Sequence, residues 1–460
     1  MEAITAQTIK KKGNNIPRIS FGNLLSMRNM AYASIAFNVL NPFLSKEIPP
    51  AELESILDDA YDPKKIPTEV QNVTGKTSIM WLTNGPTYSF KDYAARFFSR
   101  ALNHFLSKKG LRRTVVVATS GDTGGAVADS LYGLDNVDNI VFFPKGTISE
   151  GQRRQMTTLG GNVHAFEING DFDVCQALAK TILGDKEFAR EVFHDEERFT
   201  SANSISVGRL LPQAVYPFFA YSRVADIYEE MIAVIPSGNF GDMMGTVIAK
   251  EMGLPISLII CGVNENTEFP DFLRTGKYVV SPSRSSPSSA MMVSHPSNLA
   301  RLIDFYGGHM SDERDPATMK VKREGVIDRM PDMDAMRRDI ISESIDNERH
   351  YTTMSYVYFE HKVILDPHTA VGWAALEDHL KGRHDQLAVI YATADPGKFP
   401  LDVMKATGID PDLPEGMRRQ ASAQERIYSI TSEPEYTEQG MKLSVRQIEE
   451  AKSEIRTIFS

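Results

Sequence analysis

Two glycine-rich loops, each placed directly after an apolar run, most constrain how this chain can fold. The loops are Thr119-Ser-Gly-Asp-Thr-Gly-Gly125 and Pro236-Ser-Gly-Asn-Phe-Gly-Asp242, and the apolar runs before them are 114–119 and 231–236. Each loop opens into a segment with the pattern of a helix. In such a strand-to-helix turn, backbone N–H groups approach an anion closely and the helix N-terminus adds partial positive charge. The pattern predicts an α/β fold with two anion-binding loops.

Short apolar runs alternate with amphipathic segments along most of the chain, which is typical of parallel β-sheets covered by helices. The predicted strands are 114–119, 140–143, 163–168, 231–236, 256–263 and 387–393. The serine-rich segment 281–289 predicts a loop, and 443–459 predicts a terminal helix. The first 75 residues predict a mostly helical leader.

Charge and composition exclude several classes of function. A net charge of -10 argues against nucleic acid or an anionic membrane as the main partner. No apolar run reaches the roughly 18 residues that cross a bilayer. Lys10, Lys11 and Lys12 are not followed by an apolar segment, so no signal peptide is predicted and we expect a cytoplasmic protein.

The cysteines and histidines give no sign of a metal site or a disulfide framework. Cys175 and Cys261 lie among apolar residues, which predicts buried thiols. The ten histidines are scattered without paired spacing, so no metal is predicted. His368 is the histidine best placed to line a site, although a structural hydrogen-bonding role fits it equally well.

A third motif, Ser89-Phe-Lys-Asp92, supplies an amine. Tyr88 and Phe90 place aromatic surface beside Lys91, and such surface favours the uncharged, nucleophilic form of the amine. The alternative is an ordinary solvated lysine. Combined with two anion-binding loops, the motif suggests a phosphorylated cofactor held covalently by Lys91, the arrangement that pyridoxal phosphate requires.

The loop at 237–242 is the candidate for the cofactor phosphate. Gly238 and Gly241 leave room for a dianion, while Ser237, Asn239 and backbone N–H groups offer donors. The alternative is a simple glycine-rich turn.

The loop at 120–124 is expected to meet a second anion or a ring hydroxyl. Ser120 and Thr123 suit a substrate carboxylate, and Asp122 could face the cofactor ring.

Four motifs together resemble threonine synthases of the longer microbial and fungal type. They are 84–92, 118–124, Ser201-Ala-Asn-Ser204 followed by Arg209, and 236–242, within a similarity that runs from about Ile48 to Phe399. The resemblance implies a fold type II pyridoxal phosphate enzyme, similar to the tryptophan synthase β subunit. It implies two α/β domains with parallel or mixed sheets and a helical N-terminal leader. Family members are lyases of threonine biosynthesis that convert O-phosphohomoserine and water into threonine and phosphate.

The resemblance also implies roles for individual residues. Lys91 would form the Schiff base, and Thr393 would lie against the pyridine nitrogen. The cofactor-binding set would be Lys91, Asp122, Ser237, Gly238, Asn239, Phe240, Gly241 and Thr393. The substrate-binding set would be Ser120, Gly121, Thr123, Asn203, Ser204 and Arg209, with the last three on the substrate's phosphate.

The same resemblance divides the chain into four regions. We expect a mostly helical N-terminal region, a large cofactor-binding α/β domain, a small mobile α/β domain and a C-terminal helical extension. Their limits are 1–80, then 81–105 with 230–410, then 106–229, and finally 411–460. The partner is expected to be a small amino-acid substrate, with monomer and homodimer both open.

Four substrate-side positions depart from the family pattern. Thr147, Ser206, Met292 and Asp395 stand where a basic residue, Asn, Asp and His are customary. Arg153 and Arg154 could replace part of the charge missing at Thr147. The cofactor motifs are intact while the substrate-side positions differ, which leaves the identity of the leaving group open. A second hypothesis is therefore a related enzyme of specialised metabolism that acts on another γ-substituted or phosphonate amino acid. A pyridoxal-binding regulator without catalysis is a third.

Overall fold

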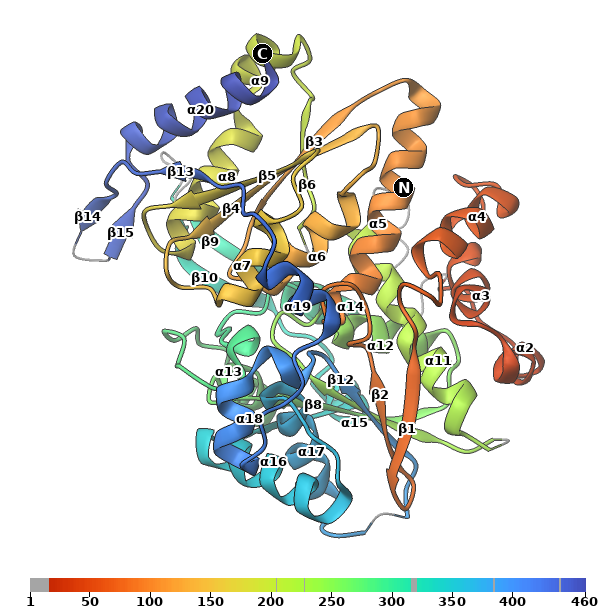
Figure 1. The fold of residues 1–460 in the computed structure, drawn as a ribbon. Helices are drawn as coiled ribbons and strands as arrows, with labels where there is room; N and C mark the ends of the chain where they lie inside the picture. The colour runs from red at the N-terminus through yellow and green to blue at the C-terminus, as the bar shows by residue number, and fades with distance from the viewer. Residues whose placement is uncertain (1–15, 204, 227, 316–320, 384, 438–439) are drawn as a thin grey trace. The chain divides into compact units, whose positions relative to one another are not determined.

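The computed structural model describes residues 16–203, 205–226, 228–315, 321–383, 385–437 and 440–460. The chain forms two compact units (Figure 1). The first unit comprises Met1–Ala94 and Ser204–Asp412, and the second comprises Ala95–Asn203 and Leu413–Ser460. Each unit is built around its own β-sheet. None of the helices in the described ranges combines the length and apolar character that a membrane crossing requires.

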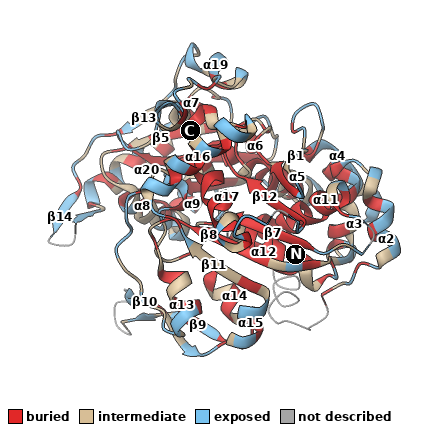
Figure 2. Cartoon of the chain, turned by 90° about the horizontal axis from the view of Figure 1, so that it is seen from below, coloured by how far each residue is buried: buried red, intermediate tan, exposed pale blue. Residues whose placement is uncertain are grey.

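A six-stranded sheet forms the centre of the first unit, in the order β1-β2-β12-β7-β8-β11. The strands are β1 (Glu69–Thr74), β2 (Thr77–Trp81), β12 (Ala388–Ala392), β7 (Met231–Pro236), β8 (Ile256–Val263) and β11 (Ile340–Ser344). All neighbouring pairs are parallel except β1 with β2. Every residue of β7 and β12 is buried, as Figure 2 shows, because helices cover both faces of a parallel sheet.

The core of this unit lies between the sheet and helix α17 (Pro367–Leu380). Asp366 begins the helix by accepting hydrogen bonds from the N–H groups of His368 and Thr369, and Pro367 occupies the first helical position. Trp373 is 1% exposed and packs into the cluster with the strand residues. Packing against α17 therefore fixes β12 and β7, so the loops at their carboxyl ends begin from well-packed strands.

The first unit contains further helices, some of which pack on the sheet and others on neighbouring helices. They are α2 (Phe21–Ser26), α3 (Tyr32–Leu44), α4 (Pro50–Ala60), α10 (Val207–Leu210), α11 (Val215–Val224), α12 (Gly241–Glu251), α13 (Glu268–Thr275), α14 (Leu299–Phe305), α15 (Met333–Asp339), α16 (Asn347–His361) and α18 (Pro400–Thr407). Helices α2–α4 confirm the helical leader, but 1–80 also contains the β1–β2 hairpin. Gly75, with φ +50, supplies the left-handed turn of that hairpin. A separate hairpin is formed by β9 (His309–Arg314) and β10 (Val321–Arg329).

A five-stranded parallel sheet forms the second unit, in the order β13-β5-β4-β3-β6. The strands are β13 (Tyr428–Ile430), β5 (Val163–Ile168), β4 (Val137–Pro144), β3 (Arg113–Ala118) and β6 (Phe199–Ser201). The helices are α6 (Asp122–Leu131), α7 (Glu150–Thr157), α8 (Phe172–Gly184), α9 (Lys186–Phe193), α19 (Glu415–Ala421) and α20 (Val445–Phe459). Helix α5 (Lys91–Lys109) begins in the first unit and continues into the second.

The last part of the chain belongs to the second unit and is not only helical. Strand β13 pairs in parallel with β5, and the rings of Tyr428 and Phe166 stack with centroids 5.0 Å apart. A small hairpin, β14 (Glu435–Thr437) with β15 (Gly440–Lys442), precedes α20. The segment expected as a C-terminal helical extension, 411–460, thus contains the helices α19 and α20 together with the short strands β13, β14 and β15.

The compact units have other limits than the expected domains. The boundary between the units falls between Asn203 and Ser204, earlier than the limit of 229 inferred from the sequence. Arg209 consequently belongs to the unit that contains Lys91. Which parts of the chain move relative to one another stays a prediction.

Candidate active site

The loop after β7 forms the first part of the site, within the first unit. Ser237 N–H donates to Gly262 O over 3.0 Å, which ties the loop to the neighbouring strand β8. Phe240, with φ +61, turns the chain into α12, and its side chain is buried against Phe269 with ring centroids 4.8 Å apart. A non-glycine residue in the left-handed region is uncommon, so packing of the phenyl ring stabilises a strained turn.

Both glycines of this loop are required by close contacts. A Cβ on Gly238 would lie 2.9 Å from Ala290 O and 3.1 Å from Met291 Cα. A Cβ on Gly241 would lie 2.7 Å from Gln213 Nε2. A side chain at Gly238 would press on the backbone of 290–291, whereas one at Gly241 would displace the end of the Gln213 side chain. The expectation that the loop needs glycine here therefore has a steric reason on the protein side as well.

Four consecutive amides of the loop are open to a ligand. Within the described ranges, the N–H groups of residues 238–241 donate to no protein acceptor. Residues 238–240 precede α12 and Gly241 is its first residue, so the amides lie at the helix N-terminus, where the helix dipole adds positive potential. A phosphate dianion fits such a set of donors. Asn239 Oδ1 accepts from Ser297 N–H over 3.1 Å, so the donor that its side chain can offer is the amide NH₂ group.

Asp242 closes the loop and is buried, with 2% of its surface exposed. Its Oδ1 accepts from Ser237 Oγ over 3.0 Å and from Met243 N–H over 2.9 Å. Among the residues that the structure describes, none donates a hydrogen bond to its Oδ2. Burial raises the pKa of Asp242 to about 6, while these hydrogen bonds and the charge of Lys91 act to lower it. The carboxyl therefore lies within electrostatic reach of the candidate lysine.

Lys91 is half-buried at the first position of α5, and its Nζ lies 5.3 Å from the centroid of the Phe90 ring. The segment before it pairs with the end of β12. Phe90 N–H donates to Thr393 O over 3.0 Å, and Ser89 forms an antiparallel bridge with Ala394. The backbone thus brings Lys91 and Thr393 together, although they are about 300 residues apart in the sequence.

The turn before Lys91 is held in a strained conformation. Tyr88 has φ +58, in the left-handed region. The buried carboxylate of Asp92 accepts from Thr87 N–H over 2.9 Å and from Thr87 Oγ1 over 2.5 Å. A Cβ on Gly85 would collide with the Asp92 carboxylate. Asp92 therefore fixes the loop from which Lys91 projects, a role that the sequence motif alone did not reveal.

Arg209 lies on α10 in the same unit and is 3% exposed. Burial lowers the pKa of its guanidinium to about 10, which leaves it charged at neutral pH. Gln213 links this helix to the cofactor loop, since its Nε2 donates to Arg209 O over 3.0 Å and packs against Gly241. Ser204, the neighbouring predicted contact, lies outside the described residues.

The loop after β3, within the second unit, carries the predicted contacts Ser120, Gly121, Asp122 and Thr123. Thr119 Oγ1 accepts from Gly121 N–H over 3.0 Å and from Gly124 N–H over 2.8 Å. Gly121 has φ +140, a conformation that glycine adopts readily. Ser120 is exposed and Thr123 is half-buried, so both hydroxyls can meet a ligand.

Asp122 begins α6 and is 5% exposed. Gln152 Nε2 donates to Asp122 Oδ1 over 2.9 Å, and nothing in the local sequence of either residue predicted this contact. Asn203, at the end of the unit, is exposed, and its N–H donates to Ser201 Oγ over 3.2 Å. The first unit therefore holds Lys91, Arg209, Thr393 and the 237–241 loop, and the second holds 120–123 and Asn203.

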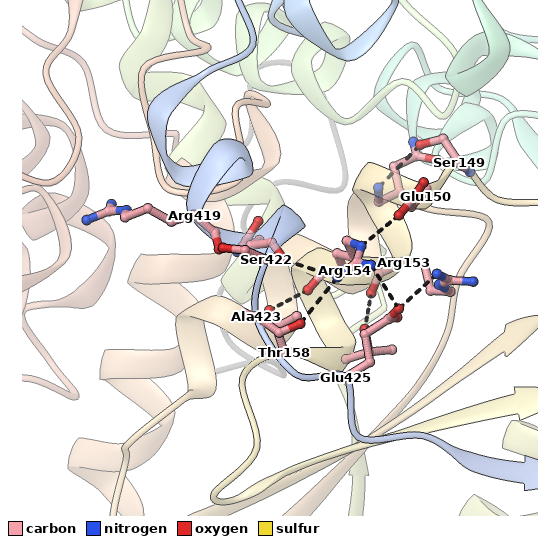
Figure 3. A network of polar contacts seen from close by, with 12 residues as sticks. Ser149, Glu150, Arg153, Arg154, Thr158, Arg419, Ser422, Ala423 and Glu425 are labelled. Carbon is pink, nitrogen blue, oxygen red and sulfur yellow. Dashed lines mark hydrogen bonds and ion pairs between the residues drawn. The ribbon is translucent and has the colours of Figure 1, made fainter.

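Arg153 and Arg154 do not replace the charge that is missing at Thr147. Arg153 NH2 lies 2.9 Å from Glu425 Oε1, and Arg154 NH2 lies 3.6 Å from the same oxygen (Figure 3). Arg154 also pairs with Glu150 over 2.9 Å. Thr147 itself is exposed. The two arginines are engaged by acids of their own unit, which corrects the expectation drawn from their position in the sequence.

The other departures have separate local environments. Met292 is 39% exposed, and its sulfur accepts from Ser286 N–H over 3.3 Å. Asp395 Oδ1 accepts from Gly397 N–H over 2.8 Å, and burial followed by repulsion from Asp366 raises its pKa. Ser206 caps α10 without a side-chain hydrogen bond to the helix.

His368 has a structural role. Its Nδ1 lies 2.6 Å from Asp366 Oδ2, and its Nε2 accepts from Ala290 N–H over 3.1 Å. Both side chains are almost completely buried. The pair thereby holds the segment at Ala290 and Met291, which packs against Gly238 in the cofactor loop. The two cysteines, Cys175 and Cys261, are buried and free, as predicted.

Sequence reasoning missed Asp92, Gln152 and Asp242 as members of the site. Asp92 and Asp242 stand inside the motifs themselves, so the signal was an acid directly after Lys91 and directly after Gly241. Gln152 had the signal of a capping box, Ser149-x-x-Gln, but this signal predicts a helix start and not a contact with Asp122.

Comparison with protein families agrees with this geometry. The model of pyridoxal-phosphate-dependent enzymes matches residues 81–393. The threonine synthase N-terminal model matches residues 13–61, and the threonine synthase C-terminal model matches residues 369–439.

Individual relatives give the same result. The threonine synthase of Pseudomonas aeruginosa is 33% identical, with 91% of this chain and 89% of the relative covered. That of Eremothecium gossypii is also 33% identical, with 90% and 88% covered. The crystal structure of pyridoxal-phosphate-bound threonine synthase from Brucella melitensis is similar with a TM-score of 0.84, 28% identity and 99% and 96% coverage. Maize serine racemase, with a TM-score of 0.52, 17% identity and 71% and 87% coverage, shares the fold alone.

Proposed function

The chain belongs to the threonine synthase family of pyridoxal-phosphate-dependent enzymes, and from this premise we propose that it converts O-phospho-L-homoserine and water into L-threonine and phosphate. The reaction makes it a carbon–oxygen lyase of threonine biosynthesis with pyridoxal 5'-phosphate as cofactor. One observation supports the proposal above all. The open amides of the 237–241 loop lie in the same unit as the backbone pairing that joins the Lys91 segment to Thr393.

We assign the cofactor's phosphate to the N–H groups of 238–241 and its covalent attachment to Lys91. Thr393, directly after β12, offers an uncharged hydroxyl for the ring nitrogen. When bound, the cofactor withdraws electrons from the substrate's amino-acid carbon atoms and so acidifies their protons. Asp122, at the start of α6, is a further residue that we propose contacts the cofactor.

Lys91 is the group placed to move protons. Its amine takes the proton from the substrate's Cα and then one from Cβ, after which the phosphate leaves from Cγ. A proton returned to Cγ forms the methyl group, water adds its hydroxyl at Cβ and gives up a proton, and a last proton returned to Cα completes the product. The half-buried position beside Phe90 limits the water that competes for this amine.

Arg209 is the proposed cation for the substrate's phosphate. A guanidinium that is 3% exposed interacts more strongly with an anion than a solvated one does. Ser120, Gly121, Thr123, Asn203 and Ser204 complete the proposed substrate contacts. We place the reaction in the cytoplasm, with an amino acid as the small-molecule partner and a monomer or homodimer as the assembly.

A second candidate function is elimination or replacement on another γ-substituted or phosphonate amino acid. It is favoured by the uncharged Thr147 and by the engagement of Arg153 and Arg154 with Glu425. Purified enzyme is offered O-phosphohomoserine, and threonine and phosphate are measured together. Equal amounts of both products support threonine synthesis. No phosphate release, with an absorbance change on adding other γ-substituted amino acids, supports the second candidate.

A further inference from the structure

Helix α7 lies beside the loop that begins α6, and Gln152 in its first turn joins the two elements. Gln152 Nε2 donates to Asp122 Oδ1 over 2.9 Å. The other end of the same amide, Oε1, accepts from Ser149 N–H over 3.3 Å as part of a capping box. Because the oxygen is occupied by the helix cap, the amide presents its NH₂ group to Asp122.

Gln152 is also the steric support of this loop. A Cβ on Gly121 would lie 2.5 Å from Gln152 Cδ and 2.6 Å from both amide heteroatoms. The side chain therefore occupies the space directly against the Gly121 backbone. Any change in the position of Gln152 reaches both the backbone at Gly121 and the carboxylate of Asp122.

The C-terminal segment fixes α7 by several independent contacts (Figure 3). Glu425 accepts from Arg153 NH2 over 2.9 Å and from Thr157 Oγ1 over 2.8 Å. Arg154 NH1 donates to the carbonyl oxygens of Gln420 and Ala423 over 3.2 and 3.3 Å.

Packing adds to these polar contacts. A Cβ on Gly151 would collide with Met417 Cε on α19. Residues 415–425 thus hold the helix from which Gln152 projects, and the distance along the chain, 272 residues between Arg153 and Glu425, makes this a tertiary constraint.

We propose that Gln152 is a positioning residue, which holds the Asp122 carboxylate in one rotamer through its NH₂ donor, with residues 415–425 holding α7 in place for it. The inference rests on the proposed function in one respect, namely that Asp122 belongs to the ligand-facing loop. A buried carboxylate that loses one of its donors is held less firmly in a single rotamer and binds a proton more readily, so the position of its charge is less defined.

Two substitutions test the donor. Gln152→Met keeps the length of the side chain and removes the amide, whereas Gln152→Glu supplies a donor only when one of the two facing carboxyls is protonated. The matched control is Ser149→Ala, which removes the cap hydroxyl and keeps the backbone N–H that orients Gln152. All variants are prepared as full-length holoenzyme.

The first measurement is hydrogen–deuterium exchange of peptides covering residues 119–131, which requires no turnover. In Gln152→Met we expect exchange in this segment to be about tenfold faster, because the buried loop loses a hydrogen bond and its support. Ser149→Ala is expected to change exchange at the start of α7 only.

The second measurement is kcat/KM against pH. Two ionised carboxylates repel, and one shared proton restores the hydrogen bond. The activity of Gln152→Glu relative to the unsubstituted enzyme is therefore expected to rise about tenfold between pH 8.5 and pH 6. The ratio for Ser149→Ala is expected to be flat. If Gln152→Met does not fold, Gln152→Glu at low pH keeps the test decisive.

Glu425→Gln tests the role of the C-terminal segment. We expect faster exchange in 150–158 together with a smaller acceleration, about threefold, in 119–125. An effect confined to 150–158 would show that the segment does not act through Gln152.

The positioning role is overturned if Gln152→Met exchanges like the unsubstituted enzyme in 119–131, or if the activity ratio of Gln152→Glu does not depend on pH. Failure of the proposed function looks different. The unsubstituted enzyme would then release no phosphate from O-phosphohomoserine, while the exchange pattern of the variants would still follow Gln152.

Discussion

The two glycine-rich loops share the order strand, loop, helix, yet they use their backbone N–H groups in opposite ways. In the 237–241 loop, four consecutive amides meet no protein acceptor within the described ranges. In the 119–125 loop, the Thr119 hydroxyl accepts from two of the amides. A loop whose amides have no protein acceptor can bind an external anion through its backbone. A loop in which two amides already donate to its own threonine hydroxyl presents its side chains to a ligand instead.

The aspartates of the two loops also differ in where their hydrogen-bond partners come from. Asp242 folds back on its own loop through Ser237, and its other oxygen is buried without a hydrogen-bond donor in the described part of the chain. Asp122 is held by Gln152 from a different helix. Similar local sequences therefore leave backbone amides open in one loop and present side chains in the other.

The largest effect that would test this contrast is expected for Gly238→Ala. The new Cβ would lie 2.9 Å from Ala290 O, so the loop must move and its amides lose their alignment. We expect the affinity of the apoprotein for pyridoxal phosphate to fall about 100-fold. Titration followed by absorbance measures it. Gly22→Ala is the control, because its nearest atom is 4.0 Å away. An unchanged affinity would mean that the backbone of this loop does not hold the phosphate.

Thr119→Val is expected to act on the other loop alone. Two buried N–H groups lose their acceptor, so the free energy of unfolding should fall by about 2 kcal/mol in urea titrations. Thr119→Ser keeps the acceptor and serves as the control. Affinity for pyridoxal phosphate should stay within about twofold, since the substitution leaves the 237–241 amides in place. A loss as large as that of Gly238→Ala would contradict the division of roles between the loops.

Local features of both units were predictable from sequence. Strands β5, β7 and β8 have the limits expected from their apolar runs, because each run ends at a turn-forming residue or a change in polarity. The open amides of the 237–241 loop could also be expected from local sequence, because glycines stand at a predicted strand-to-helix turn.

Contacts between distant segments were not predictable. The pairing of β13 with β5 and that of Arg153 with Glu425 join residues more than 260 positions apart. Both depend on tertiary packing, which no local pattern specifies. Gln152 and Asp122 are only 30 residues apart, yet their contact requires two helices to be placed side by side. The sequence therefore predicts the chemistry of the loops better than the contacts that fix them.

Asp242→Asn should reveal the buried acid through the pH dependence of stability. The pKa of Asp242 is raised by burial from 3.8 to about 6, so the folded state binds its proton more tightly than the unfolded state does. The free energy of unfolding therefore falls as pH rises from about 4 through about 6. Because asparagine does not titrate, Asp242→Asn removes this fall in the free energy of unfolding.

Relative to the unsubstituted apoprotein, Asp242→Asn is expected to be more stable by about 1 kcal/mol above pH 7, and no more stable below pH 4. This gain in stability is smaller than the full pKa shift of Asp242 implies, because the NH₂ group that replaces Oδ2 meets no acceptor among the described residues. Urea unfolding at three pH values measures the difference, and the exposed Asp58→Asn on α4 is the control. A difference that does not change with pH would show that the carboxyl is not desolvated.

The smallest effect is expected for Thr147→Lys, which restores the customary charge on the substrate side. Thr147 is exposed, so a lysine there acts through a solvated and screened interaction. We expect KM for O-phosphohomoserine to fall about twofold to threefold at low ionic strength, with kcat unchanged and the gain lost in high salt. Thr147→Gln controls for the size of the side chain. If charge at this position leaves KM unchanged, the buried Arg209 is sufficient to bind the phosphate, and the uncharged Thr147 ceases to favour a different substrate.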